Sequence, residues 1–352
     1  MSNLRSGLLE STLRSCHPGM SRFGLKTCWV LLFVCALRSA PAVAQCDVYV
    51  ANRELNSVSV FDTLTDTLKA EIPVGNQPLR IAITPDRAFA YVTNTARIGL
   101  ITSNTVAAID TTTYQVVATI PVGQYPAGVA ITPSGAFAYV ANLNSNNVSV
   151  IHTATNAVLA TVGVGTNPWR VAITPNGTFA YVTNSGSNDV SVIDTLTNTV
   201  VGTIPVGTYP AGVAITPNGV FAYVTNYISN NVSVISTATR QVVATVAVGK
   251  SPVDVAVTPN GAFAFVASDG TEDVSVIDAN SNSVVSTIPV GLAPRGVAIT
   301  PDGNFAYVTN GDDSTVSVIS TATRTVVDTI RGVAAFPEGL AIRQDVAGQS
   351  CR

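Results

Sequence analysis

Three arginines occupy equivalent places in a repeated part of the chain, each within two residues after a recurring proline. They are Arg80, Arg170 and Arg295, and the same places in other copies hold Asp254 and Glu338. A guanidinium group binds carboxylate or phosphate through two parallel N–H donors, so these arginines could together hold an anion. The adjoining aromatic residues, which could form flat apolar walls, are Trp169, Tyr125 and Tyr209. The charges could instead pair with one another around a ring, and the sequence leaves both hypotheses open.

The usual catalytic and metal-binding residue sets are missing from the sequence. His152 is the single histidine after residue 44, and it takes the place that Asp110 and Asp194 hold at the end of a predicted strand. A Ser-His-Asp triad would need this histidine among the variable loops, whereas we predict it on the opposite face. No His/Cys cluster or haem-attachment motif occurs. The acidic segments 268–273 and 311–314 could bind Ca²⁺ or be solvated turns, so we expect no cofactor, with Ca²⁺ as the one alternative.

The elements that must position these residues are seven copies of one repeat. An aromatic residue that leads Tyr-Val-Thr-Asn or a close variant occurs at positions 49, 91, 139, 181, 223, 265 and 307. The spacing is 42 residues except for one step of 48, between positions 91 and 139. A fixed period of this length indicates a propeller or stacked array rather than several unrelated domains.

One copy, residues 211–249, predicts four short strands. Residues 212–216, 221–225, 232–236 and 241–248 are rich in Val, Ile and aromatic residues, and Pro, Gly and Asn occur between them. Four antiparallel strands joined by short turns form one propeller blade. We therefore predict an all-β, seven-bladed propeller of four-stranded antiparallel blades as a single domain over residues 45–352. The N-terminal strand at 47–52 and an unpaired strand at 339–343 should share one blade and close the ring.

The first 44 residues do not belong to the repeats. A basic segment from Met20, an apolar run from Thr27 to Leu37 and small residues at Ala42 and Ala44 indicate a signal peptide over residues 1–44. Met20 is a possible alternative translation start. Export to the periplasm, the cell surface or the extracellular space would follow. The two cysteines that remain after residue 44, Cys46 and Cys351, would then form a disulfide at the ring closure.

Charge narrows the range of partners. Residues 45–352 contain 13 Lys and Arg and 20 Asp and Glu, which argues against a general nucleic-acid-binding protein. The longer step adds six residues after Asn94, and we predict that this insertion contacts a partner through Arg97, Ile98, Leu100 and Ile101 or is a neutral surface loop. We expect a monomer without a membrane span after residue 44, whose partner is a protein or a small anionic ligand.

Tyr-Val-Thr-Asn at 91, 181, 223 and 307, with Thr-Pro-Asx turns before it, resembles the YVTN-family β-propeller repeat proteins over residues 47–343. The resemblance implies a seven-bladed propeller that is often exported or surface-displayed, related to lactonase-like propellers and to the propeller domains of some periplasmic redox enzymes. Most such proteins have no assigned reaction. We therefore expect an exported, non-catalytic binding scaffold, with a lactonase-like hydrolase or a propeller subunit of a periplasmic redox enzyme as the alternative. A lactonase-like metal site would have only Asp254 and Glu338 as acidic ligands at the channel mouth.

Overall fold

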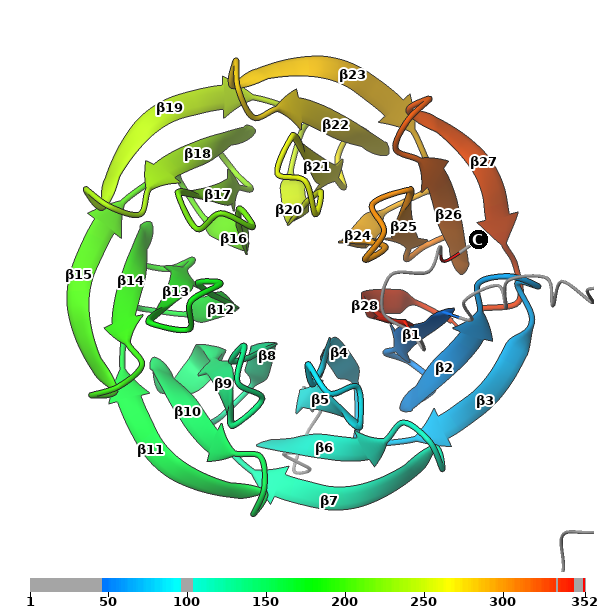
Figure 1. The fold of residues 1–352 in the computed structure, drawn as a ribbon, viewed down its shortest axis with the longest axis horizontal. Coiled ribbons are helices and arrows are strands. Elements are labelled where there is room, and N and C mark those ends of the chain that lie inside the picture. The colour runs from blue at the N-terminus through cyan, green and yellow to red at the C-terminus, as the bar shows by residue number, and fades with distance from the viewer. Residues whose placement is uncertain (1–45, 96–103, 334, 345–350, 352) are drawn as a thin grey trace, which may run out of the picture. The chain divides into compact units, whose positions relative to one another are not determined.

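The protein forms a ring of seven four-stranded antiparallel blades around a central channel (Figure 1). This computed structural model describes residues 46–95, 104–333, 335–344 and 351. The predicted signal peptide at residues 1–44, with its possible start at Met20, lies outside the described residues. None of the described helical segments is long and apolar enough to cross a membrane. The prediction of a seven-bladed propeller is confirmed.

The strands of each blade run from the channel outward. Blade 1 consists of β28 (Pro337–Gln344), β1 (Cys46–Asn52), β2 (Ser57–Asp62) and β3 (Leu68–Pro73). Blades 2 and 3 consist of β4 (Pro78–Ile83), β5 (Phe89–Thr95), β6 (Asn104–Asp110), β7 (Gln115–Pro121), and β8 (Pro126–Ile131), β9 (Phe137–Asn142), β10 (Asn147–His152), β11 (Ala157–Gly163), with a 3-10 helix at Leu143–Ser145. Blades 4 and 5 consist of β12 (Pro168–Ile173), β13 (Phe179–Asn184), β14 (Asp189–Asp194), β15 (Thr199–Pro205), and β16 (Pro210–Ile215), β17 (Phe221–Asn226), β18 (Asn231–Ser236), β19 (Gln241–Ala247). Blades 6 and 7 consist of β20 (Pro252–Val257), β21 (Phe263–Ser268), β22 (Asp273–Asp278), β23 (Ser283–Pro289), and β24 (Pro294–Ile299), β25 (Phe305–Asn310), β26 (Thr315–Ser320), β27 (Thr325–Ile330).

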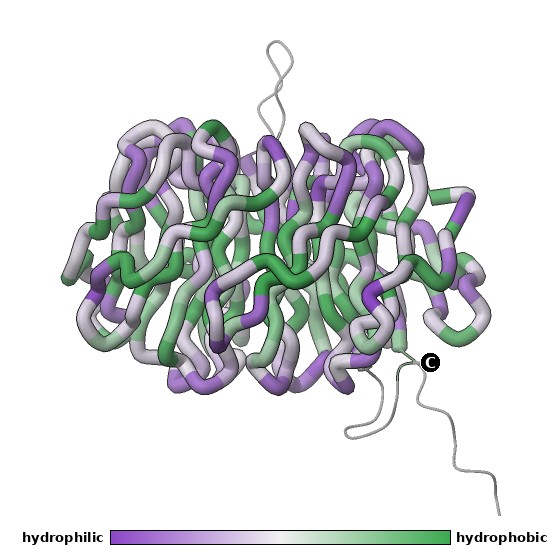
Figure 2. The backbone as a smooth tube through the Cα atoms, turned by 90° about the horizontal axis from the view of Figure 1, so that it is seen from above, coloured by the Kyte–Doolittle hydropathy of each residue, from purple (hydrophilic) through white to green (hydrophobic). Residues whose placement is uncertain are grey.

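The ring has two faces with different connections. The loop face carries the connections from the second to the third strand of a blade and from the fourth strand to the first strand of the next blade. The turn face carries the connections from the first to the second strand and from the third to the fourth. Figure 2 shows hydrophilic residues gathered in the connections at both faces, hydrophobic residues in the strands between them, and the C-terminus at the turn face. The outermost strands are half exposed, and four of them end at a proline that blocks further pairing at this free edge. These are Pro73, Pro121, Pro205 and Pro289.

The tyrosine of the repeated motif packs between blades and can also hydrogen-bond to the next blade. The hydroxyl of Tyr139 in blade 3 donates to Oδ1 of Asn198 in blade 4 at 2.7 Å. Tyr91 in blade 2 makes the equivalent bond to Asn156 in blade 3 at 2.8 Å. The rings themselves are fully buried between blades. At these two interfaces the tyrosine therefore supplies both buried apolar area and a satisfied polar tip.

The threonine and asparagine of the motif act in the same way near the channel. The Thr183 hydroxyl accepts the backbone N–H of Arg170 at 3.0 Å and donates to the carbonyl oxygen of Ala211 in blade 5 at 2.7 Å. Nδ2 of Asn184 donates to Oγ of Ser191 at 2.9 Å, which joins the second strand to the third. The motif is therefore a structural connector within and between blades.

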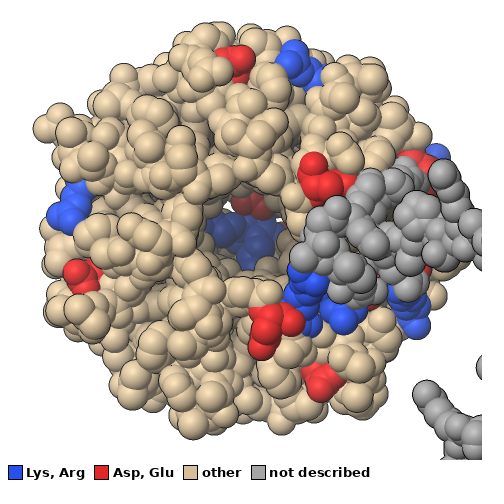
Figure 3. All heavy atoms as spheres, in the orientation of Figure 1, with Lys and Arg blue, Asp and Glu red and all other residues tan. Residues whose placement is uncertain are grey.

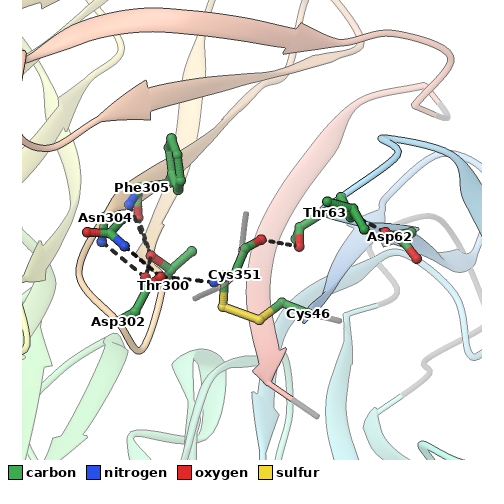
Figure 4. Close-up of a disulfide and its surroundings, with 9 residues drawn as sticks. Cys46, Asp62, Thr63, Thr300, Asp302, Asn304, Phe305 and Cys351 are labelled. Carbon is green, nitrogen blue, oxygen red and sulfur yellow. Dashed lines mark hydrogen bonds between the residues drawn. A yellow bond between two sulfur atoms is a disulfide. The ribbon is translucent and has the colours of Figure 1, made fainter. Parts of the chain in front are cut away.

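The ring closes in blade 1, where β1 pairs with β28 from the other end of the chain. Cys46 and Cys351 form a disulfide with Cα atoms 5.2 Å apart, as the sequence predicted. Cys351 is also hydrogen-bonded through its backbone on both sides (Figure 4). Its carbonyl accepts the Thr63 hydroxyl at 2.6 Å, and its N–H donates to Oδ2 of Asp302 at 2.9 Å. The disulfide thus holds the C-terminal segment against blades 1 and 7.

The buried motif tyrosines predict alkaline unfolding. Burial, together with the negative charges of Asp86 and Asp194 respectively, raises the pKa of Tyr91 and Tyr139 to about 12. Tyrosines of the unfolded chain ionise near pH 10, so the stabilisation is complete below pH 10 and is lost as the pH rises towards about 12. We expect a cooperative loss of β-sheet circular dichroism in this range.

A matched control for the alkaline transition is Tyr139→Phe, because Phe265 occupies the same place in blade 6. This variant removes one ionising group and should move the transition to higher pH. Full tyrosinate absorbance at pH 10.5 with an intact circular dichroism spectrum would contradict the prediction.

Candidate functional site

Seven equivalent residues, one from each blade, form a ring around the channel. Each lies two residues after the proline that begins an innermost strand. The members of the ring are Arg80, Gly128, Arg170, Gly212, Asp254, Gly296 and Gly339. Glycine is required where neighbouring strands approach closely, since a Cβ on Gly128 would lie 2.7 Å from the carbonyl oxygen of Trp169. The three charged members alone carry long side chains. They can extend across the channel over the space that the glycines leave.

The three charged side chains meet inside the channel. Nη2 of Arg80 lies 3.9 Å from Oδ2 of Asp254, and Nε of Arg170 lies 3.8 Å from Oδ1 of Asp254. The residues belong to blades 2, 4 and 6, which are not neighbours, so these contacts must span the channel. Figure 3, seen from the face that carries the C-terminus, shows basic and acidic side chains deep inside the central hollow.

Two backbone carbonyl groups hold the Arg80 side chain in place, because no motif threonine donates a hydrogen bond to them. Its Nη1 donates to the carbonyl oxygen of Leu79 at 3.1 Å, and its Nη2 donates to that of Arg295 at 2.9 Å. At the same place in blade 1 the carbonyl of Glu338 accepts the hydroxyl of Thr309 from the preceding blade. The blades preceding Leu79 and Arg295 carry alanine instead, at Ala51 and Ala267. Both missing hydroxyls are therefore replaced by the Arg80 guanidinium.

A second group of charges lies towards the loop face. Glu338 contacts Arg80 Nη1 through Oε2 at 3.9 Å and Arg53 Nη1 through Oε1 at 3.2 Å. Arg295 forms a separate pair with Asp269 at 3.1 Å. The Phe336 ring lies near both the Arg53 and the Arg295 guanidinium, at 6.0 and 5.5 Å from its centroid. Of the three predicted arginines, Arg295 is thus bound to an acid outside the channel network.

The connected network carries an excess positive charge. It runs from Arg53 through Glu338, Arg80 and Asp254 to Arg170, with three guanidinium groups and two carboxylates among the described residues. Nη1 and Nη2 of Arg170 make no hydrogen bond to any described residue, although only 8% of the side chain is exposed. Buried donors without acceptors are costly, and a bound water or anion would satisfy them. The excess is notable because the chain after residue 44 is acidic as a whole.

Burial changes the ionisation of the acids at this site. It raises the pKa of Asp254, against the opposing charge of Arg80 and backbone hydrogen bonds from Val297 and Val255. Burial also raises the pKa of Asp269, where Arg295 opposes the shift and the negative charges of Asp312 and Glu338 add to it. Asp254 therefore takes up a proton more readily than an exposed aspartate as the pH falls.

The predicted aromatic residues divide between two places. Tyr125 and Trp169 stack with ring centroids 6.5 Å apart, and the Arg170 guanidinium lies 5.8 Å from the Trp169 ring centroid. Tyr209 packs against Tyr227 instead, with centroids 5.7 Å apart. Trp169 thus adjoins Arg170 and Tyr125 stacks on Trp169, whereas Tyr209 pairs with a residue of its own blade.

Some residues of the network could not be found from the sequence. Arg53 and Phe336 come from opposite ends of the chain and meet only because the ring closes between them. Asp269 belongs to the predicted acidic segment 268–273, but its partner is Arg295. One departure in the sequence did mark the position of the network. The motif in blade 6 reads Phe-Val-Ala-Ser instead of Tyr-Val-Thr-Asn, and its Ala267 pairs in register with Asp254.

The remaining predictions from the sequence concern His152, a metal site and the partner loop. Nδ1 of His152 lies 3.1 Å from the Thr155 hydroxyl in the turn after β10. In the part of the chain that the structure describes, no group of three His, Cys, Asp or Glu side chains could hold a metal ion. The predicted partner loop, with Arg97, Ile98, Leu100 and Ile101, lies outside the described residues.

Comparison with known families agrees with this architecture. The family described as "Lactonase, 7-bladed beta-propeller" matches residues 40–163 and 197–335. The chain belongs to this lactonase propeller family. A comparison with curated proteins found no match.

Solved structures of similar fold include proteins of different functions. A chain of Kuenenia stuttgartiensis hydrazine synthase is 26% identical with a TM-score of 0.71, covering 78% of this lactonase-family chain and 92% of its own. A functionally unknown protein from Desulfotomaculum acetoxidans is 22% identical, with a TM-score of 0.74 and coverage of 84% and 98%. The periplasmic gluconolactonase of Pseudomonas aeruginosa is 18% identical, with a TM-score of 0.71 and coverage of 85% and 99%. The latter two similarities establish the fold alone.

Proposed function

We propose that this lactonase-family propeller is an exported binding protein that holds a small anionic ligand at the arginine–aspartate network of its central channel. The observation that carries the proposal is the Arg170 guanidinium, whose two terminal nitrogens are buried without a hydrogen-bond partner among the described residues. The disulfide Cys46–Cys351 supports export, because such bonds persist in oxidising compartments.

The arrangement favours binding over catalysis. Each carboxylate of the network lies within 4 Å of a guanidinium nitrogen, as the 3.8 Å contact from Asp254 to Arg170 and the 3.2 Å contact from Glu338 to Arg53 illustrate. These carboxylates are thus already engaged with positive charges of the chain itself. The unpaired donors of Arg170, in contrast, match the two oxygens of a carboxylate or phosphate.

Binding of small anions tests the proposal. The chain has two tryptophans, Trp29 and Trp169, so a protein that begins at residue 45 reports only the ring beside Arg170 by its fluorescence. We expect titration with sodium gluconate and inorganic phosphate, followed by fluorescence and calorimetry, to show saturable binding of at least one of them. Arg170→Met should weaken this binding at least tenfold, because it removes the unpaired donors.

The control for this experiment is Arg331→Met, which removes the same charge from an exposed position. It should bind like the wild type. Equal affinity of the Arg170→Met and wild-type proteins for both anions, or no binding by either, would contradict an anion site in the channel.

A second candidate function, hydrolysis of a lactone, is favoured by the raised pKa of Asp254. The family match and the periplasmic gluconolactonase among the structural relatives point to the same chemistry. Asp254 would then act on a water molecule at the lactone carbonyl. The discriminating measurement is the release of acid from glucono-1,5-lactone: turnover that disappears in Asp254→Asn favours the hydrolase, and a rate equal to spontaneous hydrolysis favours the binding protein.

A further inference from the structure

The wall of the channel below the charged network is apolar. After the charged or glycine position, every innermost strand continues towards the turn face with an alanine followed by isoleucine or valine. These pairs are Ala82–Ile83, Ala130–Ile131, Ala172–Ile173, Ala214–Ile215, Ala256–Val257, Ala298–Ile299 and Ala341–Ile342. All fourteen residues are only partly buried, whereas the middle strands of the blades are almost wholly buried.

Almost all of these residues also pack against the apolar clusters between blades, so only the part of each side chain that stays accessible can face the channel. The two sides of each blade pack against its neighbours, and the innermost strand has no further strand beyond it (Figure 1). Figure 3 shows that the central hollow is open on the face that carries the C-terminus, with charged side chains inside it. The hollow is therefore a well with an apolar wall and a positively charged floor.

We propose that this well binds an amphiphilic monoanion, a carboxylate with an unbranched apolar chain, which enters from the turn face. The proposal rests on the proposed anion-binding function and adds the class of ligand. The carboxylate pairs with Arg170 at the floor, and the chain lies along the alanine–isoleucine wall. From the charged position to the isoleucine is three residues of a strand, or about 10 Å, which suits a chain of about eight carbons.

Binding requires a movement of Arg170. Its terminal nitrogens are enclosed in the unliganded chain, and its guanidinium lies over the Trp169 ring. A carboxylate at the floor of the well reaches both nitrogens when the guanidinium turns away from Trp169. Ligand binding is therefore coupled to the environment of that ring, and its fluorescence changes.

The test compares ligands of one charge and different length. Acetate, butanoate and octanoate are titrated into the protein that begins at residue 45, with fluorescence and calorimetry as readouts. Burial of each CH₂ group against the wall should strengthen binding up to about fourfold. Octanoate should therefore bind at least a hundredfold more tightly than acetate, while 1-octanol and octyltrimethylammonium should bind much more weakly than octanoate.

Two variants separate the floor from the wall. Arg170→Met should reduce octanoate affinity at least tenfold and abolish the difference between octanoate and 1-octanol. Val257→Thr keeps the shape of the side chain but makes the wall polar, and it should reduce the gain from butanoate to octanoate. Val201→Thr, the same change on the exposed outermost strand β15, is the matched control and should leave all affinities unchanged.

The outcomes distinguish the two proposals. Arg170-dependent binding of gluconate, phosphate or acetate without any gain from chain length would overturn the amphiphile site and leave anion binding intact. Equal binding of octanoate, 1-octanol and octyltrimethylammonium would also overturn it, because the charged floor would then play no part. No binding of any anion would overturn both proposals.

Discussion

Replacement of Arg80 by methionine is expected to lower the free energy of unfolding by about 3 kcal/mol, the largest effect of any single substitution in the channel. Arg80 donates to the carbonyl groups of Leu79 and Arg295 and lies beside the carboxylates of Asp254 and Glu338. Methionine fills much of the same space but leaves two carbonyls and the carboxylates of Asp254 and Glu338 without this partner. Urea-induced unfolding, followed by circular dichroism at pH 7, measures the loss.

The pH dependence of this loss identifies its cause. Burial already raises the pKa of Asp254 and Arg80 opposes the shift, so the pKa of Asp254 should rise further in Arg80→Met. The folded variant then binds a proton that the unfolded chain does not, and its stability relative to wild type should recover as the pH falls from 7 towards the ordinary value near 3.9. Arg331→Met is the control and should lose little stability. A deficit below 1 kcal/mol, or one that is the same at pH 7 and pH 5, would contradict this account.

Removal of the disulfide should have a comparable or greater effect. Cys46 and Cys351 are 305 residues apart in sequence, so their bond restrains almost the whole described chain in the unfolded state. The loop-entropy relation gives about 6 kcal/mol for a loop of this length. We expect the double variant Cys46→Ser, Cys351→Ser to unfold at a correspondingly lower urea concentration than the oxidised wild type.

Reduction provides the control for the disulfide variant. Wild-type protein unfolded and refolded in excess dithiothreitol should match the double variant, and the variant itself should be insensitive to dithiothreitol. If the oxidised wild type and the variant unfold at the same urea concentration, the bond does not contribute to stability.

The blades could be predicted from the sequence because their signals are local. The motif aromatic, for example Tyr223, recurs at a fixed period, and a turn such as Pro217–Gly219 separates each pair of β-forming runs. The period also placed Cys46 and Cys351 at the two ends of one blade. With only two cysteines after residue 44, their pairing left no alternative within the chain.

The contacts in the channel could not be predicted in the same way. The repeat places Arg80, Arg170 and Asp254 at one level, but it does not say how far each side chain extends across the channel. Arg80 selects its carbonyl partners because Ala51 and Ala267 lack the hydroxyl of the motif threonine. Arg295 stands one residue earlier in its repeat than Arg80, which directs it to Asp269. These outcomes depend on side-chain conformations and on residues from distant blades.

The shared blade at the ring closure also sets the order in which the protein can be completed. A chain synthesised from its N-terminus can pair all four strands of blades 2 to 7 before residue 337 exists, whereas blade 1 must wait for β28. Until then β1 presents an unpaired inner edge, and the faces of β4 and β24 that β28 covers remain open. Such an edge readily pairs with other chains. Strand β28 therefore decides whether a nearly finished ring closes or pairs with other chains.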